Sequence, residues 1–67
     1  MKALGARVCR LRDARKWTQE TLSERSGLDR SYIAGIESGA RNPSTKVMAK
    51  VAAGFEISLA ELFESVR

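Results

Sequence analysis

The chain of 67 residues contains no histidine and a single cysteine, Cys9. One cysteine excludes an intramolecular disulfide, and without histidine it leaves no ordinary zinc site, so we expect no metal and no other cofactor. The sequence also lacks a metal-ligand cluster, a phosphate-cradling glycine loop and the size for a substantial pocket, which argues against an enzyme and against a small-molecule ligand. We expect Cys9 to be a partly exposed structural thiol in a reducing, cytoplasmic setting.

Long apolar runs are absent as well. No run is long enough to span a bilayer, and residues 1–11 alternate charged with apolar residues, unlike a signal peptide. We therefore expect a soluble chain without a membrane partner. Residues 1–67 are expected to form one domain, and a core that small buries only about 60% of the surface that its unfolded chain exposes. Oligomerisation is an obvious way to raise its marginal stability.

Charge is abundant but unevenly placed. The net charge is +4, with 11 Lys and Arg against 5 Asp and Glu over residues 1–50, and 1 against 3 over residues 51–67. A basic stripe is a usual footprint of a polyanion partner, although an excess this small is equally compatible with a merely solvated surface. The basic and acidic ends are expected to face different partners.

Apolar spacing predicts helices throughout and no strand. Leucine and valine at spacings of four and three predict an amphipathic helix over residues 2–14. A second helix is expected over residues 18–25. Thr18 is its N-cap, and Trp17, just before the cap, can pack on Leu22 as a hydrophobic staple.

Three further helices have their own start signals, which are a cap at Asp29 with a Leu28–Ile33 staple, a start near Pro43 and Ser44, and a capping box of Ser58 and Glu61. Gly27 and Gly39 are expected to end the second and third helices in the left-handed conformation. The fourth helix is expected to stop around Gly54. Five helices joined by short turns make a compact all-α fold.

The connection between the second and third helices is very short, since only Ser26, Gly27 and Leu28 lie between them. A tight turn with glycine inside it is how a helix-turn-helix unit joins its helices and sets the second of them into the major groove of a DNA duplex. Ile33 and Ile36 are expected to face the core. The groove face then carries Arg30, Ser31, Tyr32, Ala34, Gly35 and Ser38.

Residues 18–44 resemble the helix-turn-helix of the Cro and C1 repressor family, also called the XRE family, and the flanking helices resemble the rest of that lambda-repressor-like domain. The resemblance is carried by "TQ" opening the second helix, the glycine in the turn, "IESG" and "RNPS". The longer phrase "LDRSYIAGIESGARNPS" is similar to the controller proteins that time the expression of restriction and modification genes, although many small repressors share it. Ser23, Ser26 and Ala34 depart from the family's preferences, and Ser26 leaves the end of the second helix open.

The resemblance implies which side chains touch DNA. Arg30 matches the two acceptors of guanine and is expected to read a base, together with Ser31, Tyr32 and Ala34. Ser31 has an alternative explanation as a helix-start hydroxyl, and Tyr32 as a half-buried ring. Contacts with the DNA backbone are expected from Thr18, Gln19, Ser38, Arg41, Asn42 and Ser44. Gln19 can also brace Arg30 or a neighbour, and Gly35 gives either clearance for the duplex or close helix packing.

Two further expectations concern packing and assembly. In the family, the positions of Arg12 and Glu37 form a largely buried ion pair; the alternative is two surface charges worth about 0 to 1 kcal/mol. The last helix carries more apolar surface than one small core needs, which suggests a homodimer with two-fold symmetry. Its candidate interface residues are Leu59, Leu62, Phe63 and Val66, the alternative being that Leu62 alone packs inward.

The sequence therefore predicts a transcriptional regulator that binds double-stranded DNA as a homodimer on an operator with dyad symmetry. A restriction-modification controller is the narrower reading of the motif. The alternatives are a phage-type repressor, and an antitoxin or bridging module whose main partner is another protein.

Overall fold

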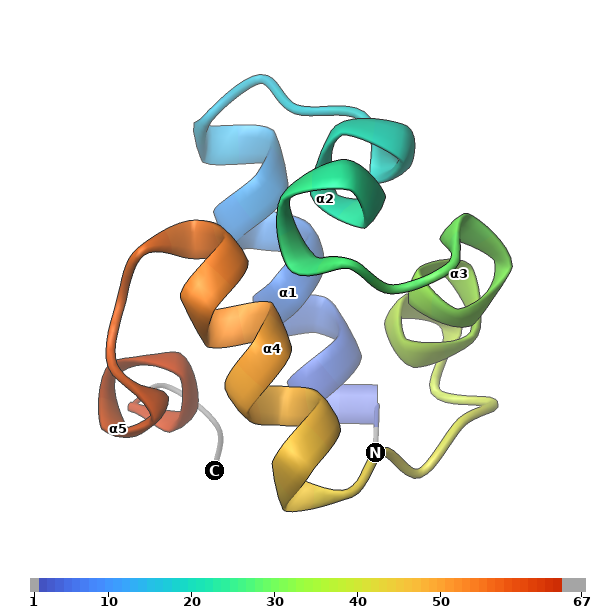
Figure 1. Cartoon of the computed structure of the whole chain (residues 1–67). Helices are drawn as coiled ribbons and strands as arrows, with labels where there is room; N and C mark the ends of the chain where they lie inside the picture. Colours follow the sequence, from blue (N-terminus) through green and yellow to red (C-terminus); the bar gives the residue numbers. More distant parts are fainter. Residues whose placement is uncertain (1, 65–67) are drawn as a thin grey trace.

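The computed structural model describes residues 2–64 of the chain. Within that range all regular secondary structure is helical (Figure 1). The helices are α1 (Lys2–Ala14), α2 (Gln19–Ser26), α3 (Arg30–Ser38), α4 (Thr45–Phe55) and α5 (Leu59–Phe63). The predicted all-α fold of five helices is confirmed for these residues.

The starts of α2 to α5 follow the local signals in the sequence. A side-chain oxygen accepts a backbone N–H from the first helical turn at Thr18, Asp29, Ser44 and Ser58. Ser58 and Glu61 also complete the predicted capping box. The first four N–H groups of a helix have no intrahelical acceptor, so each cap satisfies one of them and fixes where the helix begins.

The ends of three helices fall where the sequence predicts them, within one residue. Gly27 and Gly39 end α2 and α3 with φ of 78° and 84°. Helix α4 ends at Phe55, one residue past Gly54, and its C-cap is Glu56, whose φ is 60°. Gly54 is a packing position, because a Cβ there would lie 3.2 Å from the Cα of Ser26. The fourth helix therefore stops around Gly54 as expected, although Gly54 itself is not the cap and instead permits α2 and α4 to approach.

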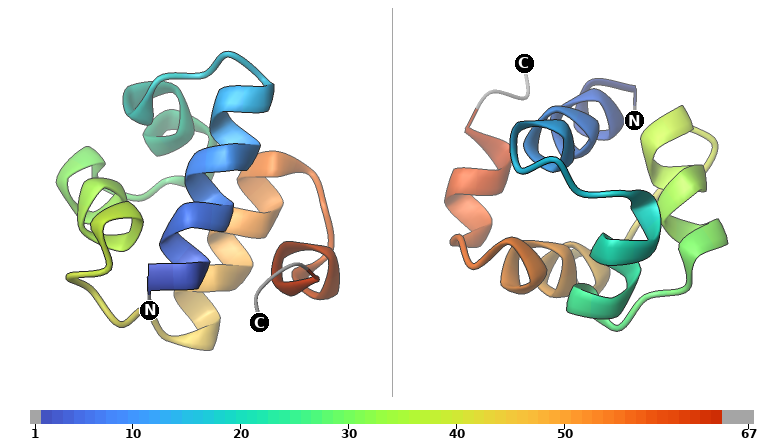
Figure 2. Two further views of the ribbon diagram at one scale, coloured as in Figure 1. Left: turned by 180° about the vertical axis from the view of Figure 1, so that it is seen from behind. Right: turned by 90° about the horizontal axis from the view of Figure 1, so that it is seen from above.

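The five helices surround one apolar core. Helix α1 packs against α3 and α5, α2 packs against α3 and α4, and α4 packs against α5. The recognition-helix candidate α3 and the short α5 lie on opposite sides of α1 and α4 (Figures 1 and 2). The buried core side chains come from all five helices and are Leu4, Val8, Leu22, Ile33, Ile36, Met48, Val51, Ala52, Phe55 and Leu62.

Trp17 makes a longer-range contact than the sequence predicts. Its ring stacks on Phe55, with ring centroids 5.4 Å apart and planes 5° from parallel. The guanidinium carbons of Arg15 and Arg25 lie 5.6 Å and 4.5 Å from the Trp17 centroid. Trp17 also packs against the core that contains Leu22. The stack thus ties the α1–α2 connection to the end of α4, beyond the local staple.

Candidate DNA-binding surface

Helix α3 buries one face and exposes the other. Ile33 and Ile36 are fully buried, whereas Arg30 and Ser31 are exposed. The carboxylate of Asp29 accepts the Ser31 hydroxyl, and it accepts the Ser31 backbone N–H at 3.0 Å. These two hydrogen bonds hold the pKa of Asp29 below its ordinary value. The Ser31 hydroxyl therefore belongs to the helix start here, while Arg30 is exposed at the first turn.

Arg12 and Glu37 form the ion pair expected from the family. The Arg12 Nε lies 2.8 Å from Glu37 Oε2, and Nη2 lies 3.0 Å from Oε1. The two side chains are only 14% and 8% exposed. This is the bidentate geometry in which a planar guanidinium matches both carboxylate oxygens. It joins the end of α1 to the last turn of α3.

A network extends the pair to α2. The Arg12 Nη1 donates to the Trp17 carbonyl at 2.7 Å, and the Gln19 Nε2 donates to Glu37 Oε1 at 3.1 Å. Gln19 therefore braces Glu37, a neighbour, and not Arg30. Burial raises the pKa of Glu37, but the hydrogen bonds from Arg12 and Gln19 and the charge of Arg12 outweigh it, so the pKa lies below its ordinary value. Three helices thus meet at one charged carboxylate.

Gly5 lets α1 and α3 approach closely enough for this pair to form. A Cβ at Gly5 would lie 2.6 Å from the Glu37 carbonyl oxygen and would also meet the carbonyl of Ile36. Both obstacles are backbone atoms. Sequence reasoning assigned Gly5 no role, because the approach of two helices far apart in the chain leaves no local signal.

Ser23 and Ser26, which depart from the family's preferences, tie the turn between α2 and α3. The Ser23 hydroxyl donates to the Leu28 carbonyl, and the Leu28 N–H donates to Ser26 Oγ at 3.2 Å. Helix α2 reaches Ser26, one residue beyond the expected end. Small polar side chains therefore suit both the hydrogen bonds of the turn and the close approach of Gly54 in α4 to Ser26.

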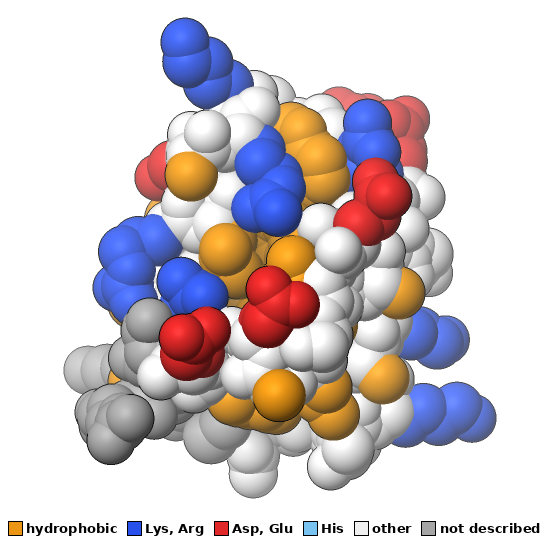
Figure 3. Space-filling model, turned by 90° about the vertical axis from the view of Figure 1, so that its left-hand side faces the viewer, with side chains coloured by type: hydrophobic (Ala, Val, Ile, Leu, Met, Phe, Trp, Pro, Cys, Tyr) orange, Lys and Arg blue, Asp and Glu red, His pale blue; other side chains and the backbone are white. Residues whose placement is uncertain are grey.

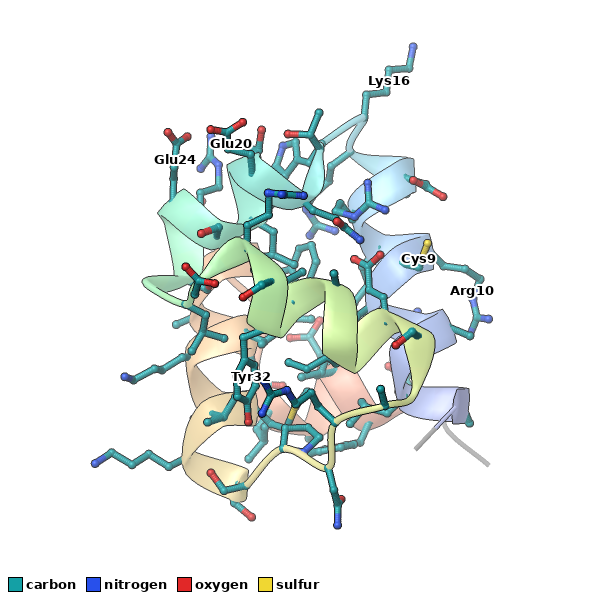
Figure 4. All side chains as sticks on the ribbon, turned by 90° about the vertical axis from the view of Figure 1, so that its right-hand side faces the viewer. Cys9, Arg10, Lys16, Glu20, Glu24 and Tyr32 are labelled. Atoms are coloured by element: carbon teal, nitrogen blue, oxygen red, sulfur yellow. The ribbon has the colours of Figure 1, made fainter. Side chains whose placement is uncertain are left out.

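The candidate backbone-binding residues lie on two sides of α3. The start of α2, with Thr18 and Gln19, is on one side, and the loop after α3 is on the other (Figure 4). The Thr18 Oγ1 and the Ser44 Oγ serve as helix caps, and the Ser38 hydroxyl donates to the Gly35 carbonyl at 3.1 Å. All the candidates except the half-buried Gln19 are exposed, namely Thr18, Ser38, Arg41, Asn42 and Ser44.

Tyr32 and Ala34 are only partly exposed on α3. The Tyr32 ring packs against the core, and the guanidinium carbon of Arg41 lies 5.1 Å from its centroid. A Cβ at Gly35 would lie 2.5 Å from Arg41 Cγ. Gly35 thus gives room to a side chain of the following loop, which neither of the two expected explanations included.

Helix α5 has less free apolar surface than the sequence suggests. Leu62 is 0% exposed and belongs to the core, so its expected place in a dimer interface is wrong; the apolar face of this short helix fills the domain's own core. Leu59 is half-buried against that core, and Phe63 is 37% exposed. Val66 lies outside the described residues. The part of the predicted interface that remains accessible is therefore Phe63 with the exposed part of Leu59.

Arg7 attaches α5 to α1. Its Nη2 donates to the Glu61 carbonyl at 3.1 Å, and its Nε donates to the Leu62 carbonyl at 3.4 Å. A cation beside the last carbonyls of a helix satisfies groups that have no intrahelical donor. Nothing in the local sequence around Arg7 indicates this contact, which spans most of the chain.

Cys9 lies beside the ion-pair network and is partly exposed, as expected. Burial raises the pKa of its thiol, and the nearby charges of Glu37 and Asp13 raise it further. A protonated thiol is a poor nucleophile. Among residues 2–64 there is no group of three or more side chains suited to hold a metal ion. No helix in the same range has the length and apolar character needed to cross a membrane.

Comparison with known proteins agrees with this geometry. Residues 10–62 match the model of the family described as helix-turn-helix. Control protein C.MunI from a Mycoplasma species is 41% identical over 49 residues, which are 73% of this chain and 66% of that protein. The crystal structure of the restriction-modification controller protein C.AhdI from Aeromonas hydrophila superposes with a TM-score of 0.88 at 45% identity, covering 92% of this chain and 94% of that one.

A second solved structure shows a relative on DNA. The controller protein C.Esp1396I, crystallised as a tetramer in complex with its natural 35 base-pair operator, has a TM-score of 0.90 at 34% identity, covering 97% of this chain and 86% of that one. The family model covers residues 10–62, which are most of the chain, and α2, the turn after it and α3 have the helix-turn-helix arrangement that the family is described by. The chain belongs to the Cro/C1-type (XRE) helix-turn-helix family of DNA-binding regulators and is similar to restriction-modification controller proteins.

Proposed function

We propose that residues 1–67 act as one DNA-binding domain that regulates transcription as a homodimer on an operator with dyad symmetry. Helix α3 enters the major groove, and Arg30 reads a base. The observation that supports this most is the buried pair of Arg12 and Glu37, which fixes α3 against α1 and leaves Arg30 exposed at the first turn. Direct readout of a base needs an exposed side chain on a helix that is held in a fixed orientation.

The relatives indicate the class of target. C.Esp1396I was crystallised on its operator, and C.MunI and C.AhdI are named as control or controller proteins. We infer that this chain also binds an operator, with a restriction-modification system as the first candidate for the genes it controls. The activity needs neither a catalytic step nor a cofactor. We place it in the cytoplasm, where a lone thiol such as Cys9 stays reduced.

Each side chain then has a distinct task. The Arg30 guanidinium can donate to both acceptors on the major-groove edge of guanine. Ser31, Tyr32 and Ala34 lie on the same helix and complete its groove face. The side chains that flank α3 hold the sugar-phosphate backbone and so set the register, namely Thr18, Gln19, Ser38, Arg41, Asn42 and Ser44. In a dimer, two half-sites about 34 Å apart would admit both α3 helices from one side of the duplex.

The test begins with selection of bound sites from random duplexes, which yields a candidate operator. Affinities of the wild type and of Arg30→Ala are then measured on that operator and on a scrambled duplex across a salt series. Arg30→Ala is expected to cost about 1 to 3 kcal/mol on the operator and to relax preference at one base pair per half-site.

Arg10→Ala is the matched control, because Arg10 is an exposed arginine on α1 and lies away from the groove face of α3. It removes the same charge and should lower the affinity for both duplexes slightly and by the same factor. The proposed readout fails if Arg30→Ala lowers affinity for both duplexes by one factor. A chain that mainly bridges proteins would show neither a preferred site nor a steep loss of affinity with salt.

A further inference from the structure

The ring of Tyr32 is held in place from beneath. Tyr32 lies on α3 next to the fully buried Ile33, and its ring packs against the core. Figure 4 shows it on the side of α3 that faces α4 and the loop after α3. A half-buried ring of this kind offers a fixed aromatic surface to a neighbouring side chain.

Arg41 of the loop lies over that surface. Its guanidinium carbon is 5.1 Å from the ring centroid of Tyr32, inside the range of about 6 Å in which a cation is attracted to an aromatic face. Its backbone N–H donates to the Gly35 carbonyl at 3.1 Å, so the start of the side chain is fixed as well. Arg41 is nevertheless exposed.

Gly35 provides the path by which the Arg41 side chain reaches the ring. A Cβ at Gly35 would lie 2.5 Å from Arg41 Cγ and 3.4 Å from Nε. Gly35 follows Tyr32 by three positions, so the two share one face of α3. Glycine inside a helix is unfavourable relative to alanine. Its presence here is explained by the passage of Arg41.

We propose that Tyr32 is a positioning residue for Arg41. The ring holds the guanidinium alongside the first half of α3, so that the loop arginine is already oriented when DNA arrives. A free arginine loses rotamer freedom when it is immobilised, and a stacked one has lost part of it beforehand. This inference rests on the proposed function, and it gives Tyr32 a task other than contact with a base.

A double-mutant cycle tests the proposal. Affinity for the selected operator is measured for Tyr32→Leu, Tyr32→Phe, Arg41→Ala and the double variant Tyr32→Leu with Arg41→Ala. Leucine keeps apolar cover over the core but removes the ring, and phenylalanine keeps the ring but removes the hydroxyl. Tyr32→Leu should weaken binding about two- to fivefold, the loss expected for an exposed cation–π contact, and Tyr32→Phe, which keeps the ring, should lose less than Tyr32→Leu.

The decisive result is the coupling. Once Arg41 is alanine, Tyr32→Leu should have no further effect on affinity. Gly35→Ala displaces the arginine by another route, so it should weaken binding only while Arg41 is present. Equal effects of Tyr32→Leu in both backgrounds overturn the proposal, and so does a loss in Tyr32→Phe as large as in Tyr32→Leu.

A measurement on the free protein tests the contact of Arg41 with Tyr32 separately from DNA binding. The side-chain proton resonances of Arg41 should be shifted upfield by the Tyr32 ring, and in Tyr32→Leu they should return to the positions of an exposed arginine such as Arg30. Absence of that shift overturns the positioning role even if DNA binds. If the shift is present but Arg41→Ala leaves affinity unchanged, the positioning role for DNA binding is also wrong, while base reading by Arg30 still stands.

Discussion

At the scale of single residues, the Arg12 side chain joins α1 to α3 and to the connection between α1 and α2. Its guanidinium uses two nitrogens on Glu37 and one on the Trp17 carbonyl. A planar fork with fixed directions suits such a junction, and lysine has no equivalent geometry. The orientation of α3 therefore depends on a contact that itself touches no base.

Replacing Glu37 by glutamine tests this dependence. Removing one partner of a buried pair leaves the other charge uncompensated, and the expected loss in the free energy of unfolding is about 3 to 5 kcal/mol. Urea unfolding at neutral pH, followed by Trp17 fluorescence, measures it. Glu24→Gln on the exposed face of α2 is the control and should change stability by less than about 0.5 kcal/mol. A change of only a few tenths in Glu37→Gln would mean that the pair does not stabilise the fold.

The lowered pKa of Glu37 predicts how the free energy of unfolding changes at low pH. The pKa of Glu37 in the folded chain lies below the ordinary value of about 4.3. Its contribution is therefore fully present above that ordinary pKa and is lost as the pH falls through the lower, folded-state pKa. The free energy of unfolding should fall more steeply below about pH 4.3 in the wild type than in Glu37→Gln.

Asp29, whose pKa is also lowered, titrates in both proteins, so the difference between the two curves isolates Glu37. Parallel curves through the acid range would contradict the assignment. The prediction does not depend on how much unfolding free energy Glu37→Gln loses at neutral pH, because it concerns the slope of the unfolding free energy with pH.

At the scale of helices, the sequence predicts what is local and misses what is not. The caps at Thr18, Asp29, Ser44 and Ser58 could be found because a cap and the N–H that it accepts lie within three residues. The role of Gly54 could not, since a helix-ending glycine and a helix-packing glycine look alike until the neighbouring helix is placed.

The candidate site divides in the same way. Residues of α3 and its loop were found because the family phrase is continuous in sequence, and Arg12 with Glu37 was found only through the resemblance. The contacts of Gln19 with Glu37 and of Arg41 with Tyr32 depend on how whole elements pack. Residue types alone allow many such pairs, and the spacing along the chain does not choose among them.

Alanine at Gly5 tests the crossing of α1 and α3. The added Cβ would meet the backbone carbonyls of Ile36 and Glu37, so the helices must move apart, and overpacking of this kind costs about 1 to 3 kcal/mol. Gly35→Ala is the matched control. There the obstacle is the side chain of Arg41, which can move, so a gain of up to about 1 kcal/mol from helix propensity offsets the lost contact with Tyr32 and the variant should be more stable than Gly5→Ala. Thermal unfolding compares the two, and equal stabilisation by both would show that the crossing is not tight.

At the scale of the whole molecule, α1 connects the proposed DNA-binding helix α3 to α5, the proposed dimer helix. Arg12 holds α3 and Arg7 holds α5, while α3 and α5 lie on opposite sides of α1 and α4. Figure 3 shows the α5 side, where apolar surface lies among basic and acidic side chains. A partner copy bound through α5 would therefore have its position relative to α3 set by one helix. The distance between the two recognition helices is then a property of the fold and not of a flexible linker.

Phe63→Glu tests whether α5 is where two copies meet. Phe63 is the one large apolar side chain that is exposed among residues 2–64, so a charge there should disrupt an interface without opening the core. Sedimentation at micromolar concentration is expected to show a dimer for the wild type and a monomer for Phe63→Glu. Because only the dimer engages two half-sites at once, the wild type should bind a two-half-site duplex much more tightly than a single half-site, and the variant should lose that advantage.

Ala14→Glu is the control, since Ala14 is the exposed last residue of α1 and the change adds the same charge. It should leave both the sedimentation and the two-half-site advantage unchanged. A wild type that is strictly monomeric at micromolar concentration argues against a preformed dimer. A dimer that survives Phe63→Glu places the interface on another face, and in that case the distance between the two α3 helices is not set by α1 through Arg7.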